Sequence, residues 1–258
     1  MAEKYALSGN NSKGEHSTAV IEIARGWKED LKTLVWLKDY ALFDENMNVR
    51  YGAILALAEG WKDDPDTLPL LKTCAQFDPV SSLRRTAVQE LSKGWKHETG
   101  IFEFLCECAV NDPFKRQDCT VLNDWAYEKY WKFNHPRYAA LTAILNQYPD
   151  HPQTLPLLRD RAKNDPDWRV RSFLVRELAR GWKNEPWMFE FLCNCALNDS
   201  FERKENWENN PRQVALDAII KQYPDHPQTL PLLQDRAEND PDEKVREFAN
   251  KKLAKIEA

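Results

Sequence analysis

Apolar residues recur along the chain at intervals of three and four positions, in short stretches that polar words interrupt. Leu68, Leu71 and Ala75 follow this spacing in one stretch, and Ile54 and Leu57 follow it in another. The spacing is typical of amphipathic helices. Because the interrupting words contain Asp, Pro or Gly, the pattern predicts an all-α chain of short helices joined by tight turns.

The helical pattern is organised in repeats, and each repeat begins with one of two words. One word is Gly-Trp-Lys and the other is Gln-Tyr-Pro-Asp-His-Pro. The repeats start near residues 26, 60, 94, 147, 181 and 222. Three of the spacings between these starts are 34 residues, a length typical of helical hairpins. The two longer spacings predict insertions at about 113–136 and 200–211.

Every repeat also has an Asp at its centre and an Arg at the start of its second half. The pairs are Asp44/Arg50, Asp78/Arg84, Asp112/Arg137, Asp165/Arg171, Asp199/Arg212 and Asp240/Arg246. Four pairs are separated by six residues, and the other two by six residues plus their insertion. The pairs give the same register as the two words, so we expect each repeat to fold as two helices. We expect Gly60, Gly94 and Gly181 to end second helices in the left-handed conformation.

These features together resemble a known family. Val49-Arg50, Val170-Arg171 and Val245-Arg246 open second helices. The sequence Leu-Ala-x-Gly-Trp-Lys occurs twice, each time running from the end of one repeat into the start of the next. In this form the sequence resembles HEAT-like α-helical repeats of the bacterial type, which occur alone or attached to NACHT/STAND-type signalling NTPases. The resemblance implies a right-handed α-solenoid of six hairpins, with residues 16–25 as an N-terminal capping helix.

The resemblance also implies a role for the Asp/Arg pairs. In HEAT-like arrays such residues form a structural ladder, in which the Asp caps the second helix and bonds an Arg of its own or the adjacent repeat. A pair that recurs in every repeat indicates architecture, because catalysis needs one site. We expect residues 1–15 to be a flexible tail and residues 16–258 to form a single solenoid.

Composition restricts the partner and the compartment. The chain has 258 residues and a formal net charge of −5, and this acidic balance disfavours a nucleic-acid partner. No apolar run approaches the ~20 residues of a membrane helix. The N-terminus lacks the basic-then-apolar layout of a secretion signal, and the six Cys are too few for a disulfide scaffold. We therefore expect a cytoplasmic protein that does not bind a membrane.

No pattern in the sequence predicts a catalytic, cofactor or metal site. The phosphate-binding words Gly-x-x-x-x-Gly-Lys and Gly-x-Gly-x-x-Gly are absent. The Cys-x-Cys words at 106–108 and 193–195 cannot readily chelate one ion, because residues two apart on a helix point about 200° from each other. We interpret these Cys as core residues, and His151 and His226 as turn residues.

Two surfaces are candidates for binding. If second helices line the concave side of the array, the positions one and five residues beyond each Arg face this groove. These positions hold Tyr51, Leu55, Arg85, Gln89, Tyr138, Thr142, Arg176, Gln213 and Asp217. Tyr, Arg and small polar groups suit protein recognition, and the partner-binding residues predicted from this set are Tyr51, Arg85, Gln89, Tyr138 and Arg176. The alternative is a solvated helix face.

The second surface is an aromatic edge formed by the insertions. The longer insertion carries Trp125 and Trp131, and the shorter one carries Trp207. Such loops either fold onto the edge of the array or present an adhesive surface to a partner.

The leading hypothesis is therefore a non-enzymatic binding module for another protein, without a cofactor. Some HEAT-like proteins are enzymes or enzyme subunits, and phycobilin lyases and alkylpurine DNA glycosylases are the alternatives that the resemblance raises. A third possibility is a repeat array with no activity of its own.

Overall fold

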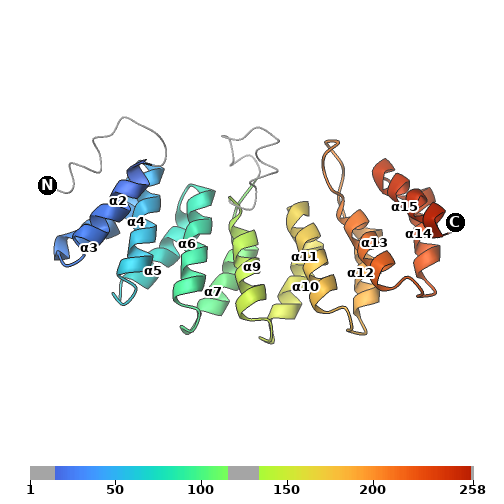
Figure 1. Cartoon of the computed structure of the whole chain (residues 1–258), viewed down its shortest axis with the longest axis horizontal. Coiled ribbons are helices and arrows are strands. Elements are labelled where there is room, and N and C mark those ends of the chain that lie inside the picture. Colours follow the sequence, from blue (N-terminus) through green and yellow to red (C-terminus); the bar gives the residue numbers. More distant parts are fainter. Residues whose placement is uncertain (1–14, 116–133, 257–258) are drawn as a thin grey trace. The chain divides into compact units, whose positions relative to one another are not determined.

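The computed structural model describes residues 15–115 and 134–256. Within these ranges it contains thirteen α-helices and no strand, so the prediction of an all-α chain is confirmed (Figure 1). The tail predicted over residues 1–15 lies outside the described residues except for Glu15, at which the first described helix begins. None of the helices in these ranges is both long and apolar enough to cross a membrane.

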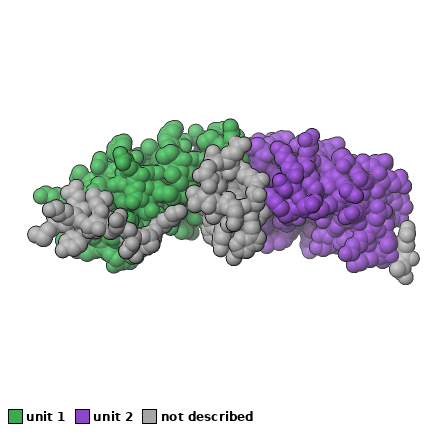
Figure 2. Space-filling model, turned by 90° about the horizontal axis from the view of Figure 1, so that it is seen from above, with its two compact units in different colours: residues 1–151 green, residues 152–258 purple. Residues whose placement is uncertain are grey.

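The chain divides into two compact units, unit 1 with residues 1–151 and unit 2 with residues 152–258 (Figure 2). The helices described in unit 1 are α2 (Glu15–Gly26), α3 (Leu31–Phe43), α4 (Met47–Gly60), α5 (Thr67–Phe77), α6 (Ser81–Gly94), α7 (Ile101–Asn111) and α9 (Pro136–Gln147). Those of unit 2 are α10 (Thr154–Asn164), α11 (Trp168–Gly181), α12 (Met188–Asn198), α13 (Pro211–Gln222), α14 (Thr229–Asn239) and α15 (Glu243–Ile256).

Both units are built from the two kinds of helix that the repeats predict. In unit 1, α3 packs on α4, α5 on α6 and α7 on α9, while α2, α4, α6 and α9 pack on one another in a row. In unit 2, α10 packs on α11, α12 on α13 and α14 on α15, and the row is α11, α13, α15. Figure 1 shows the second helices side by side within each unit. Any site built on second helices therefore has successive helices of one row as its wall.

The second helices supply most of the core. In α4, Ala53, Ile54 and Leu57 have no exposed surface, and the matching columns of α6, α9, α11 and α13 are buried in the same way. Each fully buried Leu or Ile contributes about 1.5–3 kcal/mol relative to an exposed one. A lone hairpin cannot bury this face, so the neighbouring repeat is part of the stability of each repeat.

One glycine allows a close approach between two helices of the row in unit 1. Gly52 of α4 faces α2, and a Cβ added to it would lie 2.8 Å from the carbonyl oxygen of Ser17 and 2.9 Å from Cβ of Val20. Atoms do not approach so closely without displacement, so α2 can pack at this depth only because residue 52 has no side chain.

The glycines of the Gly-Trp-Lys words do not act as predicted. Gly60, Gly94 and Gly181 are the last residues of their helices and have no positive φ; among the described glycines only Gly100 does, at 80°. Each helix extends one hydrogen bond further, as the N–H of Trp61 shows by donating to Leu57 at 3.0 Å. Trp61 then ends the helix with φ −129° and ψ 38°. The prediction of left-handed caps is therefore wrong, because the Trp position supplies the change of direction.

Candidate functional site

The predicted Asp/Arg residues lie at the turns between first and second helices, and they link neighbouring repeats. Nε and Nη2 of Arg50 donate to the carboxylate of Asp78 at 2.8 and 3.2 Å. Nη1 of the same Arg donates to the carbonyl oxygen of Asp44 at 2.8 Å. The Asp78 carboxylate also accepts the backbone N–H of Val80 at 2.8 Å, which fixes the start of α6.

The same geometry recurs along both units. The buried Arg–Asp ion pairs are Arg50–Asp78, Arg84–Asp112, Arg171–Asp199 and Arg212–Asp240, each joining residues 28 apart. Arg137 and Arg246 donate to the carbonyl oxygens of Asp112 and Asp240 at 2.8 and 2.6 Å. In each ion pair the carboxylate accepts hydrogen bonds from the guanidinium and from a backbone N–H two residues further along, so the pair fixes the turn before the second helix.

Three of the predicted partner-binding residues come together in unit 1. Tyr51 of α4, Arg85 of α6 and Tyr138 of α9 lie on successive second helices, and the charge of Arg85 interacts with both tyrosines. Arg85 is half-buried, and this burial lowers its pKa, while Tyr51, Glu90 and Tyr138 act in the opposite direction. Gln89 lies one turn further along α6 and is also half-buried. An Arg and two Tyr on neighbouring helices are a composition typical of binding hot spots.

In unit 2 the corresponding positions line a groove. Arg176 of α11 and Gln213 and Asp217 of α13 border a hollow of about 450 Å³ whose far wall includes Phe248 of α15. Lys221 lines the same groove. The sequence columns identified Arg176, Gln213 and Asp217 as neighbours on this face, but they missed Lys221 and Phe248, which lie outside those columns.

Cations outnumber anions in this groove. Asp217 accepts hydrogen bonds from Lys221 at 2.6 Å and from Lys252 at 3.0 Å. Burial opposes the ionisation of Asp217, but the two lysines outweigh it, so the pKa of this carboxyl is lowered. Arg176 is exposed and forms no ion pair with any described residue. The groove therefore presents an uncompensated guanidinium beside a carboxylate that two lysines already neutralise.

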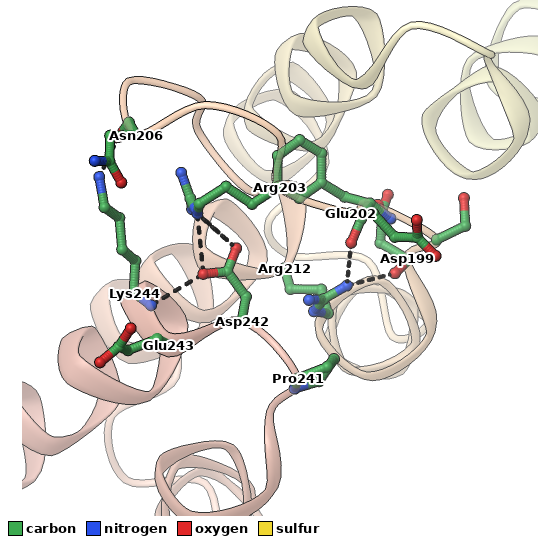
Figure 3. A pocket seen from close by; sticks show the side chains of 11 residues that line it. Asp199, Glu202, Arg203, Asn206, Arg212, Pro241, Asp242, Glu243 and Lys244 are labelled. Carbon is green, nitrogen blue, oxygen red and sulfur yellow. Dashed lines mark hydrogen bonds and ion pairs between the residues drawn. The ribbon is translucent and has the colours of Figure 1, made fainter.

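A second hollow of about 450 Å³ lies where the shorter insertion meets the start of α15 (Figure 3). Here the carboxylate of Asp242 accepts Nε of Arg203 at 3.0 Å, Nδ2 of Asn210 at 2.9 Å and the backbone N–H of Lys244 at 2.9 Å. Arg203 also donates to the carbonyl oxygen of Glu208. The two arginines of this pocket are paired with carboxylates of the protein, and the Arg203–Asp242 pair fastens the insertion to the start of α15.

Of the three insertion tryptophans, the structure describes only Trp207. The ring centroid of Trp207 lies 5.6 Å from the guanidinium carbon of Arg169. The same guanidinium carbon lies 4.2 Å from the ring centroid of Trp168. Trp207 is half-buried, so this insertion folds onto unit 2. Trp125 and Trp131 lie outside the described residues.

The two repeated words interlock, which the sequence did not predict. The hydroxyl of Tyr148 donates to the carbonyl oxygen of Lys96 at 2.6 Å, and the ring of His151 lies 3.6 Å from that of Phe102. Unit 2 has the same arrangement, with Tyr223 on Lys183 at 2.6 Å and His226 on Phe189 at 3.5 Å. The available signal was the Phe-Glu-Phe word that stands one repeat before each Gln-Tyr-Pro word. The histidines are thus packed on aromatic rings.

The five cysteines that the structure describes are buried or half-buried. Burial raises the pKa of Cys74, Cys108 and Cys195 to about 12. It raises the pKa of the half-buried Cys106 and Cys193 to about 11. The residues that the structure describes contain no group of three or more His, Cys, Asp or Glu arranged to hold a metal ion.

The comparisons with known proteins agree with the architecture. Residues 6–92 match the family model of HEAT repeats, which supports a HEAT-like repeat protein. No curated protein and no solved structure matches the chain.

Proposed function

We propose that this array, whose residues 6–92 match HEAT repeats, is a non-enzymatic binding module for another protein. The proposal includes a right-handed solenoid of six hairpins, with α2 as its N-terminal capping helix, in the cytoplasm. HEAT repeats commonly mediate protein–protein interaction, and the second helices supply the binding surface. The bacterial type and an association with a NACHT/STAND-type NTPase belong to the same proposal.

One observation carries the proposal. Tyr51, Arg85 and Tyr138 stand on three successive second helices of unit 1, and Arg85 interacts electrostatically with both tyrosines. Tyr and Arg are the residue types enriched at the energetic centres of protein interfaces. Because all three lie on packed helices, the surface exists before the partner arrives, and little conformational entropy is lost on binding.

The test is quantitative affinity capture with matched variants. The binding variants are Tyr51→Ala with Arg85→Ala, and Tyr138→Ala with Arg176→Ala, each beside a deletion of residues 115–134. The matched control is Lys32→Ala with Asn194→Ala, since both side chains are exposed on first helices. Circular dichroism melting first establishes that every variant is folded.

We expect one set of proteins to bind the wild type and the control and to be depleted by at least one binding variant. Identical capture by all variants would remove the second helices and the longer insertion as binding surfaces. Binding of alkylated DNA, or visible absorbance after co-expression with a bilin, would instead favour a HEAT-like enzyme or enzyme subunit.

A further inference from the structure

We propose that the groove between α11, α13 and α15 binds an acidic segment of a partner protein, in which Asp or Glu side chains flank an apolar side chain. The proposal rests on the function proposed above and specifies the chemistry of one partner. It concerns unit 2 alone, because every residue that lines the groove lies between Arg176 and Phe248.

The charges at the groove indicate a negatively charged ligand. Nζ of Lys221 lies 2.6 Å from one oxygen of the Asp217 carboxylate, and Nζ of Lys252 lies 3.0 Å from the other. Two ammonium groups therefore share one carboxylate, and Arg176 adds a third cation. The neighbouring Glu177 does not balance this excess, because it is paired with Arg180 on the same helix. Carboxylates of a partner would complete the charge balance, and a planar guanidinium such as that of Arg176 binds a carboxylate through two hydrogen bonds.

The apolar residues that line the groove favour an apolar side chain beside the acidic side chains of the partner. Ala179, Val214, Ala218 and Phe248 contribute apolar surface between the cations. Nζ of Lys252, which is paired with Asp217 of the groove, lies 5.0 Å from the ring centroid of Phe248, so a cation adjoins this apolar wall. A volume of about 450 Å³ lies within the range of ~300–1,000 Å³ typical of binding pockets.

A polar group on the wall fits a peptide backbone. Gln222 lines the groove, and its side-chain oxygen Oε1 is buried without a hydrogen-bond partner among the described residues. A buried acceptor in this state costs free energy that a donor from a ligand would recover. The backbone N–H of an extended peptide is such a donor.

The second hollow of unit 2, where the shorter insertion meets the start of α15, is the contrasting case. It has a similar volume, but Arg203 pairs with Asp242 at 2.9 Å, and Lys244 donates to the carbonyl oxygen of Asn206. The cations of this hollow are therefore bound by groups of the protein itself. The excess positive charge thus belongs to the groove and not to every hollow of unit 2.

The test is fluorescence anisotropy with the full chain and two labelled peptides, one alternating Glu with Leu and one alternating Lys with Leu. We expect saturable binding of the Glu peptide alone, weakened by added salt because the contacts are ionic. Arg176→Gln and Lys221→Gln should each weaken binding about 3- to 10-fold. Lys163→Gln is the matched control, since it removes an exposed cation of α10 that does not line the groove and frees no carboxylate among the described residues.

A charge exchange supplies an independent readout. Arg176→Glu should abolish binding of the Glu peptide and confer binding of the Lys peptide. The proposal is overturned if the Glu peptide does not bind, if Lys163→Gln weakens binding as much as Arg176→Gln, or if a single-stranded oligonucleotide competes more strongly than unlabelled Glu peptide. If affinity capture still depends on second-helix residues, such a failure leaves the protein-binding function intact; if capture also fails, both proposals are wrong.

Discussion

Arg50 donates to the carboxylate of Asp78, 28 residues further along the chain, and to the carbonyl oxygen of Asp44 in its own repeat. One guanidinium thus holds two repeats. The side chains of Arg50 and Asp78 are only 8% and 3% exposed, so neither charge can be satisfied by water if the other is removed.

Asp78→Asn should therefore destabilise the protein strongly. Removing one member of a buried pair leaves the other charge uncompensated, and the typical cost is about 3–5 kcal/mol. Chemical unfolding followed by circular dichroism measures the change. The control is Lys93→Gln, which breaks an exposed pair with Glu90 and should cost about 0.5 kcal/mol or less. A loss below about 1 kcal/mol for Asp78→Asn would mean that the pair contributes little.

Gly52 and Gly60 should respond in opposite directions to the same substitution. Gly52→Ala places a Cβ 2.8 Å from the Ser17 oxygen, so α2 must shift, and overpacking of this kind costs about 1–3 kcal/mol. In Gly60→Ala the nearest atom is Cε of Lys28 at 4.0 Å and φ is not positive. This variant should be unchanged or more stable by up to about 1 kcal/mol. Thermal unfolding of both variants provides the measurement, and a stabilised Gly52→Ala would contradict the close packing of α2 on α4.

The contribution of the interlocked tyrosines should disappear at alkaline pH. Burial raises the pKa of Tyr148, as does the charge of Glu103, and burial raises that of Tyr223. Because the folded-state pKa lies above the unfolded value near 10, the stabilisation is complete below pH ~10 and is lost as the pH rises through the folded-state pKa. The wild type should exceed Tyr148→Phe/Tyr223→Phe in stability at pH 8, and the difference should shrink above pH 10. Urea unfolding across this range tests it, and a constant difference would be inconsistent with these shifts.

The five described cysteines should react slowly with alkylating agents. A pKa raised from 9.0 to about 11 for Cys106 reduces the thiolate population at neutral pH by about 100-fold. Cys106 and Cys193 should nevertheless react before the buried Cys108 and Cys195. Timed labelling with iodoacetamide, read by tandem mass spectrometry, resolves each position. Labelling as fast as in urea-unfolded protein would show that these thiols are not protected by packing.

The repeated words predicted more of the fold than of the surface. The register of Asp78 and Arg84 follows from sequence spacing, because a residue type repeated at one interval must meet the same environment in each repeat. The spacing alone left open whether an Arg bonds the Asp of its own or of the adjacent repeat. In the structure Arg84 does both: it donates to the backbone carbonyl oxygen of Asp78 in its own repeat and to the carboxylate of Asp112 in the adjacent repeat.

The errors have a physical cause as well. Gly60 suggested a left-handed cap because glycine is frequent there, but a sequence does not reveal φ, and the turn is made by Trp61. Lys221 and Phe248 were missed because residues that line a groove need not share a column. Their side chains reach the hollow from positions that depend on how α13 and α15 pack.

The fixed 28-residue distance from each Arg to the next Asp determines which changes in length the gene can tolerate. Duplicating a whole repeat copies one donor and one acceptor together, so a longer array gains no orphan charge. Extra codons between the Asp and the Arg of one repeat also leave every such distance unchanged, and both insertions of this chain lie there. A deletion within the intervening stretch would instead misalign the pair, and selection against such deletions follows from electrostatics alone.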